Sequence, residues 1–388
     1  MIINVKSGSK KTSNILAAFA FTAASVLSTA AIAQGGAEIR DQYPQLADLF
    51  NAFDVTQSNT YENIVAINNN PETQEAQDSL EKNLKMMANM SMNEMMAAAM
   101  AGAGMNMSGP YGELEVQARI ALREAMDGQH SDDEAQIAFS SSTAINRHAA
   151  EVLRRGRNFE NRLFAIYVDD AIIDKQSAVA SAIENYLEDD QHSVATVSKD
   201  AGYLLAHPQA TAFKSAYPRL SGLLWSNQWL QLAVLEAVIM ENLDSELSGG
   251  VEIALERFWN KVGSAGGMTM FPAPSELPMA PTIAPDLYSQ SPQAAAIIDN
   301  LNVMETVIAD VLAYPNLEGR EAIIDGVIAE YTNKEENLAD SLDYLLFALR
   351  GGIYNQGGPA VGELMQSERN RSRSAMNMQH TMIMSAPQ

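Results

Sequence analysis

Apolar residues recur at intervals of three and four along most of this chain, and this period constrains the fold more than any other feature. From Ile297 to Val311 they step by four, three, four and three residues, which is the spacing that places side chains on one face of an α-helix. The same spacing recurs within 338–349 and 225–239. In β-strands apolar and polar residues would alternate with a period of two. Almost no alternating run of this kind lies between residues typical of hairpin turns. The sequence therefore predicts an all-α, multi-helix, bundle-like protein.

Capping and helix-breaking residues predict where several helices begin and end. The run 131–134 has a serine cap followed by a glutamate three residues on, a capping box that predicts the start of one long helix. A methionine-rich helix is expected over 72–101, between a proline and two closing glycines. The run 333–336 is expected to open a helix that ends before two further glycines. The segment 220–240 has a single charge and is predicted to be the central buried helix of the larger domain.

A proline-rich stretch at 264–292 suggests the domain organisation. Six prolines lie between 272 and 292, and proline at this density does not fit helix interiors, so an extended linker or a surface strap is expected. This linker would divide an acidic helical domain at 34–263 from a small helical unit at 293–350. The remaining residues, 351–388, are predicted to be a flexible tail that contains Met and Arg.

The first 33 residues resemble a secretory signal peptide. Three lysines precede an uncharged, mostly apolar stretch that ends in Ala31-Ile32-Ala33, the small-x-small pattern at which signal peptidase cleaves. Cleavage is expected before Gln34, with no transmembrane span afterwards, because the apolar stretch is too short and too rich in Ser and Thr for a stable span. The mature chain is therefore predicted to be periplasmic or secreted.

Charge and cysteine usage exclude several classes of protein. The predicted signal takes three lysines from the chain's 25 Lys and Arg and none of its 48 Asp and Glu, which leaves a net charge of −26. A field of this sign repels nucleic acid, so no nucleic-acid partner is expected. The absence of cysteine excludes a lipid-modified N-terminal Cys, disulfides and thiolate metal sites.

Methionine is clustered in two short segments. Nine of the 21 methionines lie between residues 86 and 107, and four more surround a histidine near the C-terminus. Thioether sulfur is a soft ligand that selects Cu(I) or Ag(I), and residues one helical turn apart can share an ion. These segments resemble the Met-rich segments of exported copper-handling proteins, although the likeness covers only these residues. The candidate metal ligands are Met86, Met90, Met92, Met96, Met100, Met376, Met378, His380, Met382 and Met384.

Other uses of the methionines stay open. A flexible Met-rich surface also suits contact with a protein partner or lipid. Methionine side chains can absorb oxidants by forming sulfoxides, and methionine often serves as ordinary packing.

No certain cofactor follows from the sequence, with Cu(I) as the one candidate. A protein partner in the cell envelope is expected, and nothing predicts the oligomeric state.

No motif with a catalytic mechanism is present. The chain lacks a nucleophile elbow, a P-loop and a dinucleotide fingerprint. The acidic run that ends in Asp189 and His192 is interpreted as a solvated helix end, and the basic residues between 147 and 162 as partners of neighbouring glutamates. The sequence thus favours an exported, soluble helical binding or interaction protein without a catalytic site. A periplasmic Cu(I)- or Ag(I)-binding protein is the first alternative, and a helical enzyme without known motifs is the second.

Overall fold

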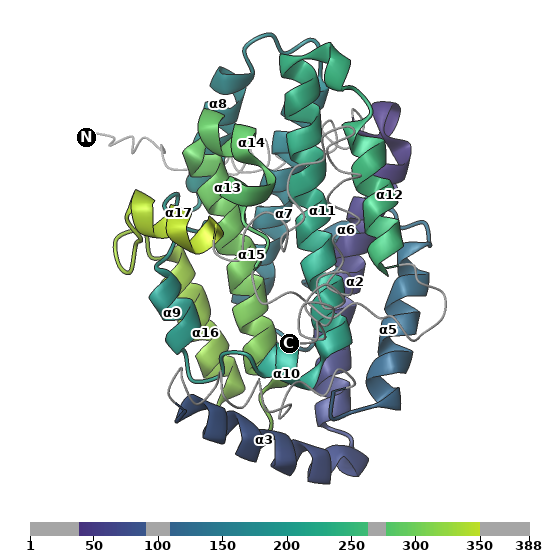
Figure 1. Ribbon diagram of the computed structural model, residues 1–388, viewed down its shortest axis with the longest axis vertical. Helices are drawn as coiled ribbons and strands as arrows, with labels where there is room; N and C mark the ends of the chain where they lie inside the picture. The colour runs from purple at the N-terminus through teal and green to yellow at the C-terminus, as the bar shows by residue number, and fades with distance from the viewer. Residues whose placement is uncertain (1–38, 91–108, 263–276, 350–388) are drawn as a thin grey trace, which may run out of the picture.

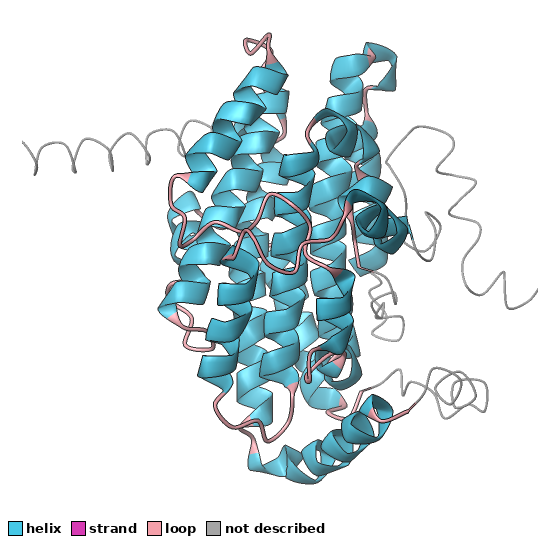
Figure 2. Cartoon of the chain, turned by 90° about the vertical axis from the view of Figure 1, so that its left-hand side faces the viewer, coloured by secondary structure: helices cyan, strands magenta, loops and turns pink. Residues whose placement is uncertain are grey.

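The computed structural model describes residues 39–90, 109–262 and 277–349, and every regular element within them is helical (Figures 1 and 2). Across these ranges β-type pairing is limited to an isolated antiparallel bridge between Lys199 and Leu338. The prediction of an all-α fold is therefore confirmed. In chain order the elements are α2 (Pro44–Asn68), η1 (Pro71–Thr73), α3 (Gln74–Ala88), α5 (Glu113–Met126), α6 (Asp132–Ile137), α7 (Arg147–Val168), α8 (Lys175–Leu187), α9 (Ala201–Ala206), α10 (Ala212–Ala216), α11 (Pro218–Leu243), η2 (Ser245–Leu247), α12 (Gly250–Val262), α13 (Ala280–Ile283), α14 (Pro285–Gln290), α15 (Pro292–Ala313), α16 (Arg320–Thr332) and α17 (Ser341–Leu349).

Four long helices form the centre of the molecule. Helices α2, α7, α11 and α15 run roughly along its long axis, and α3 lies across one end (Figure 1). Helix α15 packs against α2 and α7, and α11 packs against α7, α2 and α12. Buried apolar residues from Ile39 to Ala348 belong to one hydrophobic cluster, so helices on both sides of the proline-rich stretch contribute to the same core.

Helix α11 is the central buried helix that the sequence predicts. Trp225 and Trp229 are both buried within it, as are most residues from Leu220 to Ile239. A helix that is apolar on nearly all sides is stable in water only when neighbours surround it. No helix in the described ranges is both long enough and apolar enough to cross a membrane.

Several helices begin at a carboxylate that is distant in sequence. Helices α10, α11, α13 and α14 have no side-chain cap from their own N-terminal residues. The backbone N–H groups of Arg219 and Leu220 donate instead to Glu115, at 2.6 and 3.1 Å. Similarly, the Asp299 carboxylate accepts a hydrogen bond from the backbone N–H of Ala280 at the start of α13. The Glu236 carboxylate accepts one from the backbone N–H of Asp286 at the start of α14. Buried carboxylates therefore satisfy the free amides of these helix ends.

The predicted helix limits are correct in part. Ser131 and Glu134 form the expected capping box, but the helix ends at Ile137, so the prediction of one long helix is wrong. The chain turns there because Glu62 of α2 binds the next loop, accepting hydrogen bonds from the Ser142 hydroxyl and the Ala144 N–H at 2.7 and 3.0 Å.

Two further helix limits differ from the prediction. The run 333–336 forms a turn, in which the Asn333 side chain accepts from the backbone of Glu335 at 2.9 Å, and α17 begins only at Ser341. Helix α3 ends at Ala88, because Asn89 closes it with a side-chain bond to the Lys85 carbonyl at 2.7 Å. The rest of the predicted helix 72–101 lies beyond Met90, outside the described residues.

The described part of the proline-rich stretch is not an extended surface strap. Residues 280–283 are all buried in α13, and α14 follows directly. Three of the prolines, Pro281, Pro285 and Pro292, occupy the first turns of α13, α14 and α15, where the missing N–H has no intrahelical partner to lose. Residues 278–284 therefore form part of the core.

Candidate functional site

A cavity of about 150 Å³ lies between α9, α10, α11, α15 and α17. Its wall is mainly aromatic and aliphatic, with several polar groups. The apolar residues that line it are Leu204, Ala210, Phe213, Leu224, Trp225, Leu277, Val303, Val307 and Phe347. The polar residues are His207, Thr211, Lys214, Ser221, Gln228, Thr306 and Asp310.

His207 and Asp310 form a buried pair at this wall. The His207 Nε2 atom lies 3.4 Å from an Asp310 carboxylate oxygen, and the His207 side chain is only 8 % exposed. The other ring nitrogen, Nδ1, is buried and has no hydrogen-bond partner among the described residues. An unpaired buried polar atom costs about 1–3 kcal/mol, so the His207 ring has an unmet capacity for a hydrogen bond at Nδ1.

Asp310 also holds the chain in place around the cavity. Its carboxylate accepts hydrogen bonds from the backbone N–H groups of Thr211 and Phe213, at 3.3 and 2.7 Å, where α10 begins. Burial raises the pKa of Asp310, while its bonds to His207 and to these amides oppose the rise. One carboxylate from α15 therefore orients both the histidine and the helix start.

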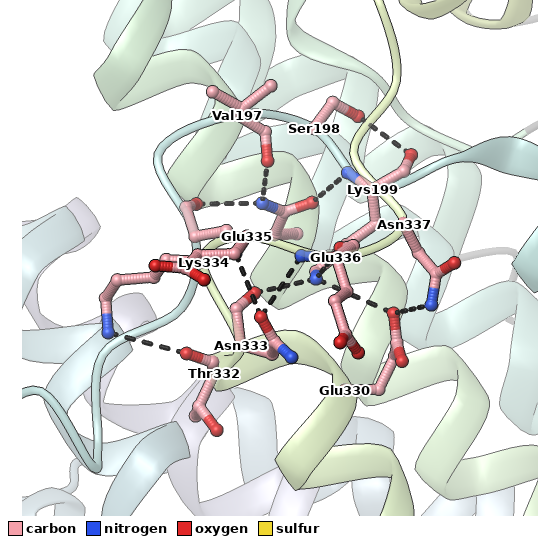
Figure 3. A network of polar contacts seen from close by, with 12 residues as sticks. Val197, Ser198, Lys199, Glu330, Thr332, Asn333, Lys334, Glu335, Glu336 and Asn337 are labelled. Carbon is pink, nitrogen blue, oxygen red and sulfur yellow. Dashed lines mark hydrogen bonds and ion pairs between the residues drawn. The ribbon is translucent and has the colours of Figure 1, made fainter.

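A polar network fixes the segment that leads to His207 (Figure 3). The Lys199 ammonium donates to the carbonyls of Asn333 and Glu336, at 2.7 and 2.6 Å, and lies 3.6 Å from Glu330. The Asn300 side chain of α15 accepts from the Lys199 N–H at 2.9 Å. Burial lowers the pKa of Lys199, but its acceptors occupy the ammonium, so its role is to anchor the chain just before α9.

Gln228 connects the cavity to a second buried site. It lines the cavity from α11 and donates through Nε2 to a Glu305 carboxylate oxygen and to the Asn302 carbonyl, both at 2.9 Å. The other carboxylate oxygen of Glu305 lies 3.2 Å from the Arg157 guanidinium. One glutamine thus separates the cavity from a buried ion cluster.

Three carboxylates share the Arg157 guanidinium in that cluster. Asp54 of α2 lies 3.2 Å from Arg157 Nε, Glu160 of α7 lies 2.7 Å from Nη1, and Glu305 of α15 completes the set. Gln57 accepts a further bond from Nη2 at 2.6 Å. Burial raises the pKa of Asp54 and of Glu160 to about 7, against the opposing attraction of Arg157. The cluster is therefore an acidic site that gains negative charge near neutral pH.

The predicted methionine site is only partly within the described residues. Met86 lies in the last turns of α3 with 53 % of its surface exposed, and Met90 follows the helix end, half-buried. The other predicted ligands lie outside the described residues: Met92, Met96, Met100, Met376, Met378, His380, Met382 and Met384. The signal peptide at 1–33 and the tail at 351–388 lie outside them too.

The structure also places the other polar residues that the sequence analysis considered. Arg154 pairs with Glu151 and Arg157 with Glu160, so the ion-pair interpretation is confirmed for these two arginines. Asp189 and His192 pair with each other at 3.0 Å. Within 39–90, 109–262 and 277–349, no group of three or more His, Asp and Glu side chains is arranged to hold a metal ion.

The chain was compared with protein-family models, with curated proteins and with solved structures. No family model, curated protein or solved structure matches. Inferences about function therefore depend on the chain's own residues.

Sequence reasoning did not identify the residues around this cavity. His207 and Asp310 are 103 positions apart, and no spacing rule joins them. A signal was present in α15, where Asp299, Glu305 and Asp310 interrupt an otherwise mostly apolar segment. Acids on the buried face of a helix need partners, so they mark places where polar contacts converge.

Proposed function

We propose that this chain is an exported helical binding protein of the cell envelope, and that a compact, mainly apolar molecule binds in the cavity beside α10. The cavity is the observation that carries the proposal. It has a volume of about 150 Å³ and combines an apolar wall with a few converging polar groups, which is the usual composition of a small-molecule site. An engineered cavity of roughly 150 Å³ in another protein binds benzene. The expected ligand is therefore about the size of one ring.

The envelope part of the proposal is supported by the N-terminal pattern. A positive start, an uncharged apolar stretch and Ala31-Ile32-Ala33 are typical of an exported precursor. Expression of the full chain in a bacterium, followed by fractionation and mass measurement, tests this. A mature protein in the periplasm that begins at Gln34 is expected, and a full-length cytoplasmic product would contradict it.

Fluorescence quenching by bromobenzene tests ligand entry. Trp225 lines the cavity, so a heavy-atom probe that enters it should quench this indole in a saturable way. The Trp225→Phe variant is the control, because quenching that persists unchanged in it arises elsewhere. Absence of saturable quenching in the wild type would refute the proposed function.

Two substitutions on α15 provide a matched structural control. Val307 lines the cavity, whereas Val311, one turn later, is buried in packed core. Val307→Phe should fill the cavity and abolish saturable quenching with little loss of stability. Val311→Phe should destabilise the fold by about 1–3 kcal/mol, because it overpacks a filled site. Equal destabilisation of both variants in urea titrations would argue against an open cavity.

A second function, soft-metal binding, is supported by the exposure of Met86. Its thioether is accessible at the end of α3, as a Cu(I) or Ag(I) ligand must be. Cu(I) titration of the mature protein against a competing chelator should show tight binding. Replacing Met376, Met378, Met382 and Met384 with Leu should weaken it, and replacing Met86 and Met90 should weaken it separately. Identical titration curves for all of these proteins would exclude the metal function.

A further inference from the structure

Acidic groups outnumber basic groups around the cavity. Asp310 forms part of the cavity wall. Glu305 lies behind the wall residue Gln228, which donates a hydrogen bond to it at 2.9 Å. Behind Glu305, Asp54 and Glu160 surround the same guanidinium. Four carboxylates therefore lie in or directly behind this part of the interior.

Among the described residues, two permanently basic side chains, Arg157 and Lys214, oppose these carboxylates. Arg157 is enclosed by its three carboxylates and is separated from the cavity by Gln228. Lys214 lies half-buried in the wall and has an interaction of its own. His207 adds positive charge only when it is protonated. The carboxylates are thus in surplus, in a region where water does not screen them well.

From this surplus we infer that the ligand is a compact apolar molecule that carries a positive charge, such as an amine attached to a single ring. This inference rests on the proposed function, because it names the chemical class of ligand for the same cavity. An apolar ring matches the aliphatic wall, and an ammonium matches the carboxylates. An acid of the same size would meet the same carboxylates with like charge.

The aromatic part of the wall suits the same class of ligand. Phe213, Trp225 and Phe347 line the cavity from α10, α11 and α17. Aromatic rings attract cations as well as apolar surfaces, and tryptophan does so most strongly. The wall therefore accommodates both ends of an apolar amine.

The charge surplus should grow between pH 6 and pH 8. Burial raises the pKa of Asp54 and Glu160 to about 7, so both lose protons in this range. An amine that stays protonated throughout should bind more tightly at the higher pH. The charged and titratable groups involved are Asp54 on α2, Arg157 and Glu160 on α7, His207 after α9, Lys214 on α10, and Glu305 and Asp310 on α15.

Three probes of nearly equal size and different charge test the inference. Benzylamine, benzyl alcohol and benzoate are titrated separately into the mature protein, with displacement of bromobenzene as the readout. Benzylamine is expected to bind about tenfold more tightly than benzoate, more tightly than benzyl alcohol, and more tightly at pH 8 than at pH 6. Benzyl alcohol controls for ring burial without charge.

Two variants assign the preference to particular charges. Lys214→Gln removes the ammonium in the wall and should strengthen benzylamine binding several-fold. Glu305→Gln removes a carboxylate behind Gln228 and should weaken it, with little effect on benzyl alcohol. Because Glu305 is buried, the Lys214 variant and the wild-type pH series keep the inference testable if the Glu305 variant does not fold.

The outcomes separate the inference from the proposed function. Preference for benzyl alcohol or for benzoate in the wild type would overturn the inference and leave ligand binding intact. An amine preference that is unchanged in Lys214→Gln and between pH 6 and pH 8 would overturn it too, because the named charges would then not cause it. If bromobenzene itself fails to bind, the proposed function fails first.

Discussion

Two of the buried carboxylates on helix α15, Glu305 and Asp310, lie five residues apart and have different surroundings. Glu305 faces Arg157 at 3.2 Å, in a buried cluster with two further acids. Asp310 faces His207 at 3.4 Å and the first amides of α10, with an open cavity of about 150 Å³ beside it. At one site a guanidinium of the chain fills the space, and at the other the space remains open.

The difference lies in the groups that each carboxylate meets. A buried carboxylate needs a cation or several donors, and Glu305 receives a guanidinium from a neighbouring helix. Asp310 receives backbone donors and a histidine instead, and a cavity lies beside these groups. The space that remains is therefore where a ligand is proposed to bind.

The largest effect is expected when the Arg157 guanidinium is removed from the ion cluster. Arg157→Leu leaves three buried carboxylates without a counter-charge and should lower the free energy of unfolding by about 3–5 kcal/mol. Urea unfolding at pH 7.5 measures this. A loss below about 1 kcal/mol would mean that the cluster does not depend on its guanidinium.

A smaller loss is expected at the cavity. Asp310→Ala uncaps the start of α10 and leaves His207 without its carboxylate partner, which should cost about 1–3 kcal/mol. The same urea experiment applies. Because the cavity has room for water, this loss should be smaller than that of the Arg157 variant, and the reverse order would undermine the contrast.

Part of the pH dependence of stability should come from the cluster, and Glu236 and Asp299, whose pKa values burial also raises to about 7, should add to it. Asp54 and Glu160 have pKa values of about 7 in the folded protein, because burial disfavours their charged forms, against about 4 in an unfolded chain. The folded state thus binds more protons between these values, and the free energy of unfolding should fall as pH rises from 5 to 8. Asp54→Asn should flatten this fall in urea titrations at pH 5, 6, 7 and 8. A slope that is unchanged in the variant would assign the dependence to other groups.

The smallest effect is expected one turn from the cluster on the same helix. Arg154 pairs with Glu151, and both side chains are partly exposed, so Arg154→Leu should change stability by less than about 1 kcal/mol. This variant is the matched control for Arg157→Leu. If the two variants lose equal stability, burial of the ion cluster is not what matters.

Much of the fold could be predicted because helical period and capping are local. The apolar spacing of 297–311 and the low charge of 220–240 correctly indicated buried helices, and Ser131 with Glu134 correctly indicated a helix start. The lengths of the helices were less predictable. Helix α6 ends after six residues because Glu62 binds the following loop from another helix, and nothing near that loop in the sequence indicates this contact.

What the sequence determined by itself is the helical class, the acidic charge and the central place of the segment that became α11, since each follows from residues close together along the chain. Only the tertiary structure decided which acids became caps, which distant acids met Arg157 and which bordered a cavity. Asp310 and His207 are 103 positions apart, and Arg157 meets Glu305 and Asp54 across three helices. The physical reason is that a buried charge is stabilised by whatever groups packing brings within a few ångströms, and a local pattern does not record which groups those are.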